Sequence, residues 1–455
     1  MAKVKAFQSV FEAALVDIAD RTDAKTRCLI LSGGVDTCAI LEAANQLGIT
    51  FAASVTVITG DDSPDKGFAI AAAKEHGLPH HLLRITADEL VEGYLKECVE
   101  LLETFDSNTL RNSLVIAAAF RKVAELGFKD VVVGDGADEL FGGYSFMWGN
   151  AEDPLQWKEK RDSMCAKWTF ATADLAAANG LVSHSPYTEP KTVAWAIENA
   201  ERSDCIGVRP IRLVYGGDAS DHQTGKMILR EAYATVSSWR RKDPIEVGSG
   251  VTVVGKDPYW AKIISDEDFK AEAEQLLVRG FVMKNKEHLF YFREFEKHFG
   301  RDGSSHPNKT RLALGDGCAG CCFEIGDAMY CRMCSAWPQL LATSFQSSSL
   351  TTILYRFVGL IGKCSKAEAS GGKPLIPFNS TTTTTATSCQ ILRYVIPPLF
   401  PWIAKTPWHC KITGKGSPDT SKVGMEAFQQ IPHDCCRQQH PQKRQYVPHP
   451  MHTIL

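Results

Sequence analysis

The chain has 455 residues, of which 44% are hydrophobic and 23% charged, and its formal net charge is −3. This is ordinary globular composition, long enough for two or three domains. Residues 341–455 hold 12 Lys and Arg against 4 Asp and Glu, so the first 340 residues are acidic, which makes nucleic acid an unlikely partner. The sequence shows no signal-peptide pattern and no continuous apolar span, so we expect a cytoplasmic protein with no membrane contact. We also expect its 15 cysteines to be mostly reduced.

Strand and helix patterns alternate through the first 140 residues. An amphipathic pattern predicts a helix over 5–20, and a Thr-Ala-Asp-Glu capping box at 86–89 opens another. Apolar runs predict buried strands at 28–31, 51–58, 80–85 and 130–133. The alternation predicts an α/β fold with a doubly wound parallel sheet. Further on, helices are expected at 172–179, 189–199 and 225–236.

The first chemical signal is the stretch Leu-Ile-Leu-Ser-Gly-Gly-Val-Asp-Thr at 29–37. A strand that turns through two glycines into a helix start presents free N–H groups and a helix dipole to an anion. Asp36 would repel phosphate unless a cation lies between them, so its presence suggests Mg²⁺. An ordinary strand-to-helix turn is the alternative for so short a motif.

The second signal is Gly-Asp-Gly-Ala-Asp-Glu-Leu-Phe-Gly-Gly-Tyr at 134–144, directly after the strand expected at 130–133. Three carboxylates within five residues are costly to place together without a cationic partner. Ligands of open α/β sheets bind at the carboxyl ends of the strands. The two strands can therefore direct Asp36 and Asp138 toward one site.

These motifs resemble those of a known family. The 32–37 loop is similar to the pyrophosphate loop of the ATP pyrophosphatase (PP-loop) group, and the 134–144 string is similar to the matching motif of the asparagine synthetases. Between them, residues 105–113 resemble the Asp-x-x-Thr-x-Arg segment of that family, and the similarity covers roughly residues 10–265. The fold implied is the adenine nucleotide alpha hydrolase-like sheet.

The resemblance also implies site residues. ATP and pyrophosphate are expected on Leu31, Ser32, Gly33, Gly34, Asp36, Thr37, Val57, Gly134 and Asp138. Mg²⁺ is expected on Asp36 and Asp138, and the predicted catalytic residues are Lys242, Asp135 and Arg111. Lys242 follows a Trp-Arg-Arg segment and would stabilise developing negative charge, although a solvated basic turn is the alternative for such a run.

The implied reaction is ATP-dependent amide formation through an acyl-adenylate, with release of AMP and pyrophosphate. Residue 2 is Ala, where glutamine-dependent members carry a nucleophilic Cys, and only about 30 residues precede the loop. We therefore expect ammonia or an amine as the nitrogen donor, from solution or from a separate amidotransferase subunit. Asp135 stands where the family usually has Glu, and His184 stands near an expected Arg. These differences argue against aspartate as the carboxylate substrate more than they argue against adenylation.

A third signal is a pair of Cys-x-x-Cys knuckles, Cys318/Cys321 and Cys331/Cys334. Four thiolates at this spacing can bind one Zn²⁺, and the alternatives are unliganded cysteines or a redox pair. The predicted domains are a synthetase-like domain at 1–275, a helical linker at 276–312, a zinc module at 313–340 and a disordered, low-complexity tail at 341–455.

Two other functions fit parts of this pattern. A tRNA-modifying sulfur transferase of the same ATP pyrophosphatase group would use the loop, the cysteines and the basic tail. A non-catalytic scaffold would keep the nucleotide fold for binding alone, but such a protein has no physical need for clustered carboxylates.

Overall fold

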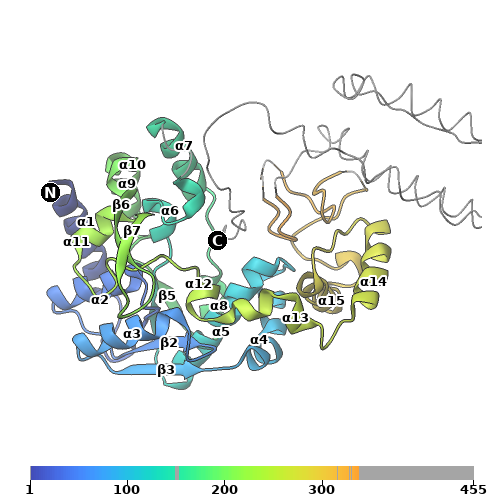
Figure 1. The fold of residues 1–455 in the computed structure, drawn as a ribbon, viewed down its shortest axis with the longest axis horizontal. Coiled ribbons are helices and arrows are strands. Elements are labelled where there is room, and N and C mark those ends of the chain that lie inside the picture. The colour runs from blue at the N-terminus through green and yellow to red at the C-terminus, as the bar shows by residue number, and fades with distance from the viewer. Residues whose placement is uncertain (1, 149–152, 315, 327, 329, 338–455) are drawn as a thin grey trace, which may run out of the picture. The chain divides into compact units, whose positions relative to one another are not determined.

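The computed structural model describes residues 2–148, 153–314, 316–326, 328 and 330–337 (Figure 1). The predicted tail at 341–455 lies outside the described residues. Five parallel strands form the central sheet in the order β3-β2-β1-β4-β5. They are β1 Arg27–Ile30, β2 Ala53–Ile58, β3 His80–Arg84, β4 Asp130–Val132 and β5 Val182–His184.

The four strands expected from the sequence are confirmed, with ends that differ by one or two residues. The fifth, β5, was not predicted because it has only three residues and its Val182 side chain is exposed, so it lacks an apolar run. Its place beside β4 comes from pairing alone, with Val131 opposite Ser183.

Helices cover both faces of the sheet, so the doubly wound arrangement is confirmed. Neighbouring residues of β1 show this, because alternate side chains of a strand point to opposite faces. Cys28 packs in one core and Leu29 in the other. The Leu29 face is covered by α1 Ala2–Asp20, α2 Val35–Gln46 and α3 Pro64–Glu75. The Cys28 face is covered by α4 Ala87–Leu102, α5 Ser107–Glu125 and α8 Ala171–Ala178.

The capping box predicted at the start of α4 is present. The Glu89 N–H donates to Thr86 Oγ1 over 3.2 Å, and the Thr86 N–H donates to Glu89 Oε2 over 2.7 Å. Each bond satisfies a backbone donor that has no partner within the helix. Helix α5 is capped by Asp106, whose carboxylate accepts from the Asn108 N–H over 2.9 Å.

Shorter elements follow β4. The helices are α6 Ala137–Phe141, α7 Pro154–Cys165, α9 Pro190–Asn199, α10 Arg202–Cys205, α11 Met227–Ala232, α12 Ile245–Gly248 and α13 Asp257–Trp260, with 3-10 turns at Ser145–Met147, Val251–Gly255 and Arg301–Gly303. An antiparallel hairpin joins β6 Gly207–Arg212 to β7 Ala219–Thr224. The hairpin was not predicted because most of its side chains are exposed and polar.

Two further helices, α14 Asp266–Val278 and α15 Lys286–Phe299, lie beside the Cys-rich segment (orange in Figure 1). Within the segment expected to be a linker, Phe292 and Phe295 of α15 are fully buried in the same core as α4 and α5. The domain boundaries expected at 275 and 312 stay predictions. None of the helices in the described part of the chain is long and apolar enough to cross a membrane.

Candidate active site

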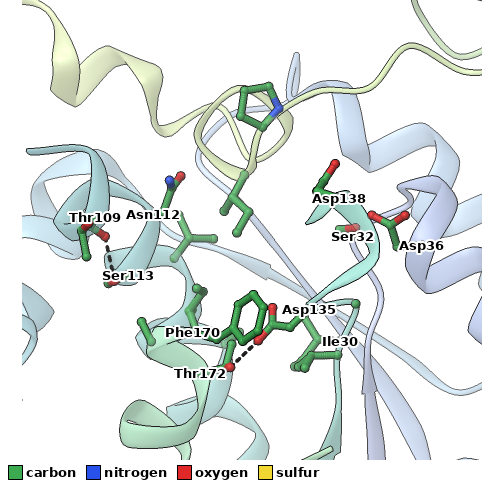
Figure 2. A pocket seen from close by; sticks show the side chains of 18 of the residues that line it. Ile30, Ser32, Asp36, Thr109, Asn112, Ser113, Asp135, Asp138, Phe170 and Thr172 are labelled. Carbon is green, nitrogen blue, oxygen red and sulfur yellow. Dashed lines mark hydrogen bonds between the residues drawn. The ribbon is translucent and has the colours of Figure 1, made fainter. Parts of the chain in front are cut away.

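A cavity of about 700 Å³ opens at the carboxyl ends of the sheet strands. Most of the predicted ligand-binding and catalytic residues line it: Ser32, Gly34, Asp36, Thr37, Val57, Gly134, Asp135, Asp138 and Lys242. Figure 2 shows Ser32, Asp36 and Asp138 gathered on one side, with Thr109 and Asn112 of α5 across the cavity. The parallel topology explains this, because β1 and β4 are neighbours and the loops that follow them leave the same edge.

One ammonium group joins the two predicted metal-binding carboxylates. Lys226 Nζ lies 2.8 and 2.6 Å from the two carboxylate oxygens of Asp36 and 2.7 Å from Asp138 Oδ1. Its side chain is 1% exposed. Burial alone would lower the pKa of Lys226, but the charges of Asp138 and Asp36 outweigh it and raise this pKa. The lysine is therefore held charged at the centre of the site.

Lys226 reaches this position because glycines leave space for it. A Cβ on Gly143 would lie 2.4 Å from Lys226 Cε, and a Cβ on Gly225 would lie 1.9 Å from the Gly142 carbonyl oxygen. The Lys226 N–H donates to the Phe141 carbonyl over 2.9 Å. The Phe-Gly-Gly part of the 134–144 motif thus provides both the space for the Lys226 side chain and a hydrogen bond to its backbone. Sequence reasoning did not assign this lysine, and the Gly-Lys pair at 225–226 is the only local signal.

The carboxylates fit the magnesium ion that the sequence implies. Mg²⁺ prefers oxygen ligands and is commonly held by one or two carboxylates beside phosphate groups. Asp36 lies in the first turn of α2 and Asp138 in the first turn of α6, yet both lie within 2.8 Å of one positively charged nitrogen. The donor type and the convergence on a cation both suit a divalent metal.

The Ser-Gly-Gly loop is held in a fixed shape. Ser32 Oγ lies 3.2 Å from Thr37 Oγ1 and accepts from the Gly34 N–H over 3.2 Å. Gly33 has a φ of +69°, and a Cβ there would lie 2.6 Å from the Ala69 nitrogen, so a side chain is excluded by both conformation and space. The loop presents Ser32, Gly34 and Thr37 to the cavity.

Two predicted ATP-binding residues do not line the cavity. Leu31 is fully buried in the core beneath α1 and α2. Gly33 turns its carbonyl away to accept from Arg240 Nη1 and from Ser237 Oγ, both over 2.7 Å. Leu31 and Gly33 thus shape the loop while their neighbours line the cavity, and a role for these two residues in ATP binding stays a prediction.

Lys242 is not the solvated surface residue of the alternative interpretation. Its side chain is 16% exposed, and its Nζ lies 3.8 Å from Asp138 Oδ1 and 5.2 Å from the centre of the Tyr144 ring. The neighbouring Arg240 is buried and pairs with Asp65 over 3.0 Å. The basic turn therefore brings positive charge to the same edge of the cavity as Lys226.

Asp135 lies deeper in the cavity, where its carboxylate accepts a hydrogen bond from the Thr172 hydroxyl (Figure 2). Burial raises the pKa of Asp135 to about 6, and the nearby charges of Asp138 and Asp36 act in the same direction. A carboxyl group with a pKa near neutrality is suited to proton transfer.

Arg111 does not line the cavity, and its predicted catalytic role stays a prediction. Its guanidinium is buried behind the cavity wall, where Nε lies 2.9 Å from Glu287 Oε1 and Nη1 lies 2.5 Å from Glu246 Oε2. These ion pairs join α5 to α12 and α15. The next residue, Asn112, is the one that lines the cavity. A helix rotates by about 100° per residue, so Arg111 and Asn112 point in different directions from α5.

The four predicted zinc ligands lie together in the Cys-rich segment. The sulfur atoms of Cys318, Cys321, Cys331 and Cys334 all lie within 4.8 Å of one another. All four thiols are buried and none forms a disulfide.

Comparison with known proteins gives matches to asparagine synthases. The family model for asparagine synthase matches residues 10–204. A probable glutamine-hydrolysing asparagine synthetase of Dictyostelium discoideum is 27% identical over 228 residues, which are 46% of this chain and 38% of that protein. Asparagine synthetase B of Escherichia coli K12 is 28% identical over 195 residues, which are 41% of this chain and 33% of that protein.

Among solved structures, an NMN synthetase from Francisella tularensis matches with a TM-score of 0.23 and 15% identity, over 42% of this chain and 91% of that one. The chain spans between 33% and 38% of the length of the two synthetases above. The matched region contains β1 to β5, the 32–37 loop and the 134–144 motif. Residues 10–204, which hold both motifs, are therefore similar to the asparagine synthase family.

Proposed function

We propose that this protein forms amide bonds at the expense of ATP, through an acyl-adenylate. The observation that carries the proposal is the convergence of Asp36 and Asp138 on Lys226, beside the Ser-Gly-Gly loop. Paired carboxylates next to N–H and hydroxyl donors make a site for a metal-bound polyphosphate. The match of residues 10–204 to the asparagine synthase family model supports the choice of a carbon–nitrogen ligase.

In this proposal the phosphates of ATP lie against Ser32, Gly34 and Thr37, and a substrate carboxylate oxygen attacks the α-phosphorus. The bond to the β-phosphate oxygen breaks and pyrophosphate leaves. Lys226 and Lys242 stabilise the negative charge that develops on the leaving group. Magnesium held by Asp36 and Asp138 would neutralise part of the phosphate charge.

The second half-reaction takes place on the mixed anhydride. An ammonia or amine nitrogen attacks the activated carbonyl carbon, the bond to the AMP oxygen breaks, and the nitrogen loses a proton. Asp135 is the proposed base, because it lines the cavity and has a raised pKa. We propose aspartate or an analogue as the carboxylate, with nitrogen taken from solution or from a separate amidotransferase subunit.

Pyrophosphate release from Mg-ATP tests this function. The proposal predicts release that requires a carboxylate substrate, and asparagine as product when aspartate and ammonium are both supplied. Release with other carboxylates but not with aspartate would keep adenylation and change the substrate. Absence of release with any small carboxylic acid would reject amide formation.

The pH profile tests the role of Asp135. Because its pKa is about 6, the base form is lost as the pH falls through 6, so we expect kcat/KM to fall about tenfold per pH unit below that value. Asp135→Glu should shift this acidic limb, and Asp135→Asn should remove most of the activity. Burial raises the pKa of Glu139 to about 7, so Glu139→Gln is the control that should keep the limb. Loss of the acidic limb in Glu139→Gln would mean that Glu139, and not Asp135, is the group that titrates there.

The sulfur transferase alternative requires a thiol that reaches the bound nucleotide. No cysteine of the described residues lines the cavity, and all ten cysteines among them are buried. A buried thiol resists ionisation, and the thiolate is the reactive form. Amide ligation therefore remains the function that the geometry supports best.

A further inference from the structure

The Cys-rich segment has the sulfur geometry of a tetrahedral metal site. With zinc–sulfur bonds of about 2.3 Å, a tetrahedron places its sulfur atoms about 3.8 Å apart. Cys318 Sγ lies 3.5 Å from Cys334 Sγ, and Cys321 Sγ lies 3.7 Å from Cys331 Sγ. These separations are far too long for disulfides, which have sulfur–sulfur bonds of about 2.05 Å.

The backbone around the cluster favours thiolates held close together. The Gly320 N–H donates to Cys318 Sγ over 3.2 Å, which stabilises negative charge on the sulfur. A Cβ on Gly320 would lie 3.0 Å from Cys334 Sγ, so this glycine lets the second knuckle approach the first. The fifth cysteine, Cys322, turns the other way and its sulfur lies 3.6 Å from the Gly280 carbonyl oxygen.

The second knuckle also forms part of the cavity wall. Arg332 and Met333 lie between two of the cluster cysteines, and both line the cavity. Their carbonyl groups accept hydrogen bonds from the residues just before α5: Thr104 Oγ1 donates to Arg332 O over 2.6 Å, and the Phe105 N–H donates to Met333 O over 3.1 Å.

A third contact reaches the cap of α5. The Tyr330 hydroxyl donates to Asp106, the residue whose carboxylate caps the helix. Thr109 and Asn112 in the first turns of α5 face the cavity opposite Asp36 (Figure 2). The second knuckle is therefore hydrogen-bonded to the wall that faces the carboxylate site.

We propose that Cys318, Cys321, Cys331 and Cys334 bind one structural Zn²⁺, and that this ion fixes the wall formed by Arg332, Met333 and the start of α5. Borderline-soft Zn²⁺ suits four thiolates, and a site with four protein ligands leaves no open position for catalysis. The four cysteines lie far from the 32–37 loop in sequence, yet the ion that they bind would organise a wall of the same cavity. The proposed zinc site does not depend on the proposed function. Only the identity of the ligand in the cavity rests on that function.

Metal analysis of the purified full chain tests the site. We expect about one zinc per chain in the wild type and in Cys322→Ser, and loss of zinc in Cys321→Ser and Cys334→Ser. Cys322→Ser is the matched control because it changes a buried neighbouring thiol outside the cluster. A wild-type protein that is free of zinc, one that carries iron instead, or equal loss in Cys322→Ser would overturn the proposal.

Two measurements on the wild type avoid variants that fail to fold. X-ray absorption at the zinc edge should show four sulfur atoms at about 2.3 Å, and a shell containing nitrogen or oxygen would overturn the ligand set. Hydrogen exchange should show that removing zinc with a chelator exposes the backbone at 103–110 and 330–336 but leaves β2 protected. Unchanged protection at 103–110 in the zinc-free protein would reject the structural link to the wall.

Pyrophosphate release, measured on the same samples, separates this inference from the proposed function. Zinc bound at the four cysteines without any turnover would reject the ligase and keep the zinc site. Full turnover in protein shown to lack zinc would reject the proposed control of the cavity wall and keep the ligase.

Discussion

Replacing Asp36 with Asn is expected to reduce pyrophosphate release by about 10²–10³-fold, the usual cost of losing one electrostatic contact to a transition state. The amide has nearly the shape of the carboxylate but carries no charge, so the site loses half of its paired negative charge for the metal. Lys226 would then be held by Asp138 alone. Steady-state measurement of pyrophosphate at saturating Mg-ATP gives the comparison.

The matched control for this variant is Asp17→Asn. Asp17 lies on α1, is 47% exposed and pairs only with Lys191 over 3.3 Å. The same chemical change there should leave the rate within about twofold, because an exposed ion pair contributes at most about 1 kcal/mol. If Asp36→Asn kept more than a third of the wild-type rate, the carboxylate pair would have no role in the chemistry.

Replacing Lys226 with Met is expected to lower the free energy of unfolding by about 3–5 kcal/mol when magnesium and nucleotide are absent. The variant leaves the partly exposed Asp36 and Asp138 close together without the buried ammonium that lies between them. Their mutual repulsion and their loss of hydration both act on the folded state. Urea denaturation followed by circular dichroism measures the change.

Addition of Mg²⁺ should restore part of this loss, because the ion can replace the missing positive charge between the carboxylates. The control is Lys262→Met, since Lys262 and its partner Asp88 are 48% and 54% exposed. That change should cost between 0 and about 1 kcal/mol and should not respond to Mg²⁺. Equal losses in the two variants would mean that Lys226 is not the counter-ion of a shared carboxylate site.

Much of the fold follows from local sequence. Apolar runs marked four of the five sheet strands, because a strand buried on both faces reads as a continuous hydrophobic segment. The capping box at Thr86 fixed a helix start through bonds within four residues. The two motifs at strand ends predicted the cavity, because parallel strands deliver the residues that follow them to one edge of the sheet.

Other features were settled by contacts that are distant in sequence. Arg111 matched a motif, but its two glutamate partners are 135 and 176 residues away and hold it outside the cavity. Lys226 carries no motif of its own, and its role depends on the space left by Gly143 and on Asp36, which is 190 residues away. Strand β5 exists through its pairing with β4, since its own three residues have no apolar pattern.

The sequence by itself thus determined four strands of the sheet, the Ser-Gly-Gly loop, the carboxylate motif and the spacing of the four cysteines, because each of these is a local pattern in the sequence. The tertiary structure decided which cation joins Asp36 to Asp138, which side of α5 faces the cavity, and that the Cys331–Cys334 knuckle forms part of the cavity wall. These depend on the packing of distant segments, where burial forces each charged or polar group to find a partner that no local pattern specifies.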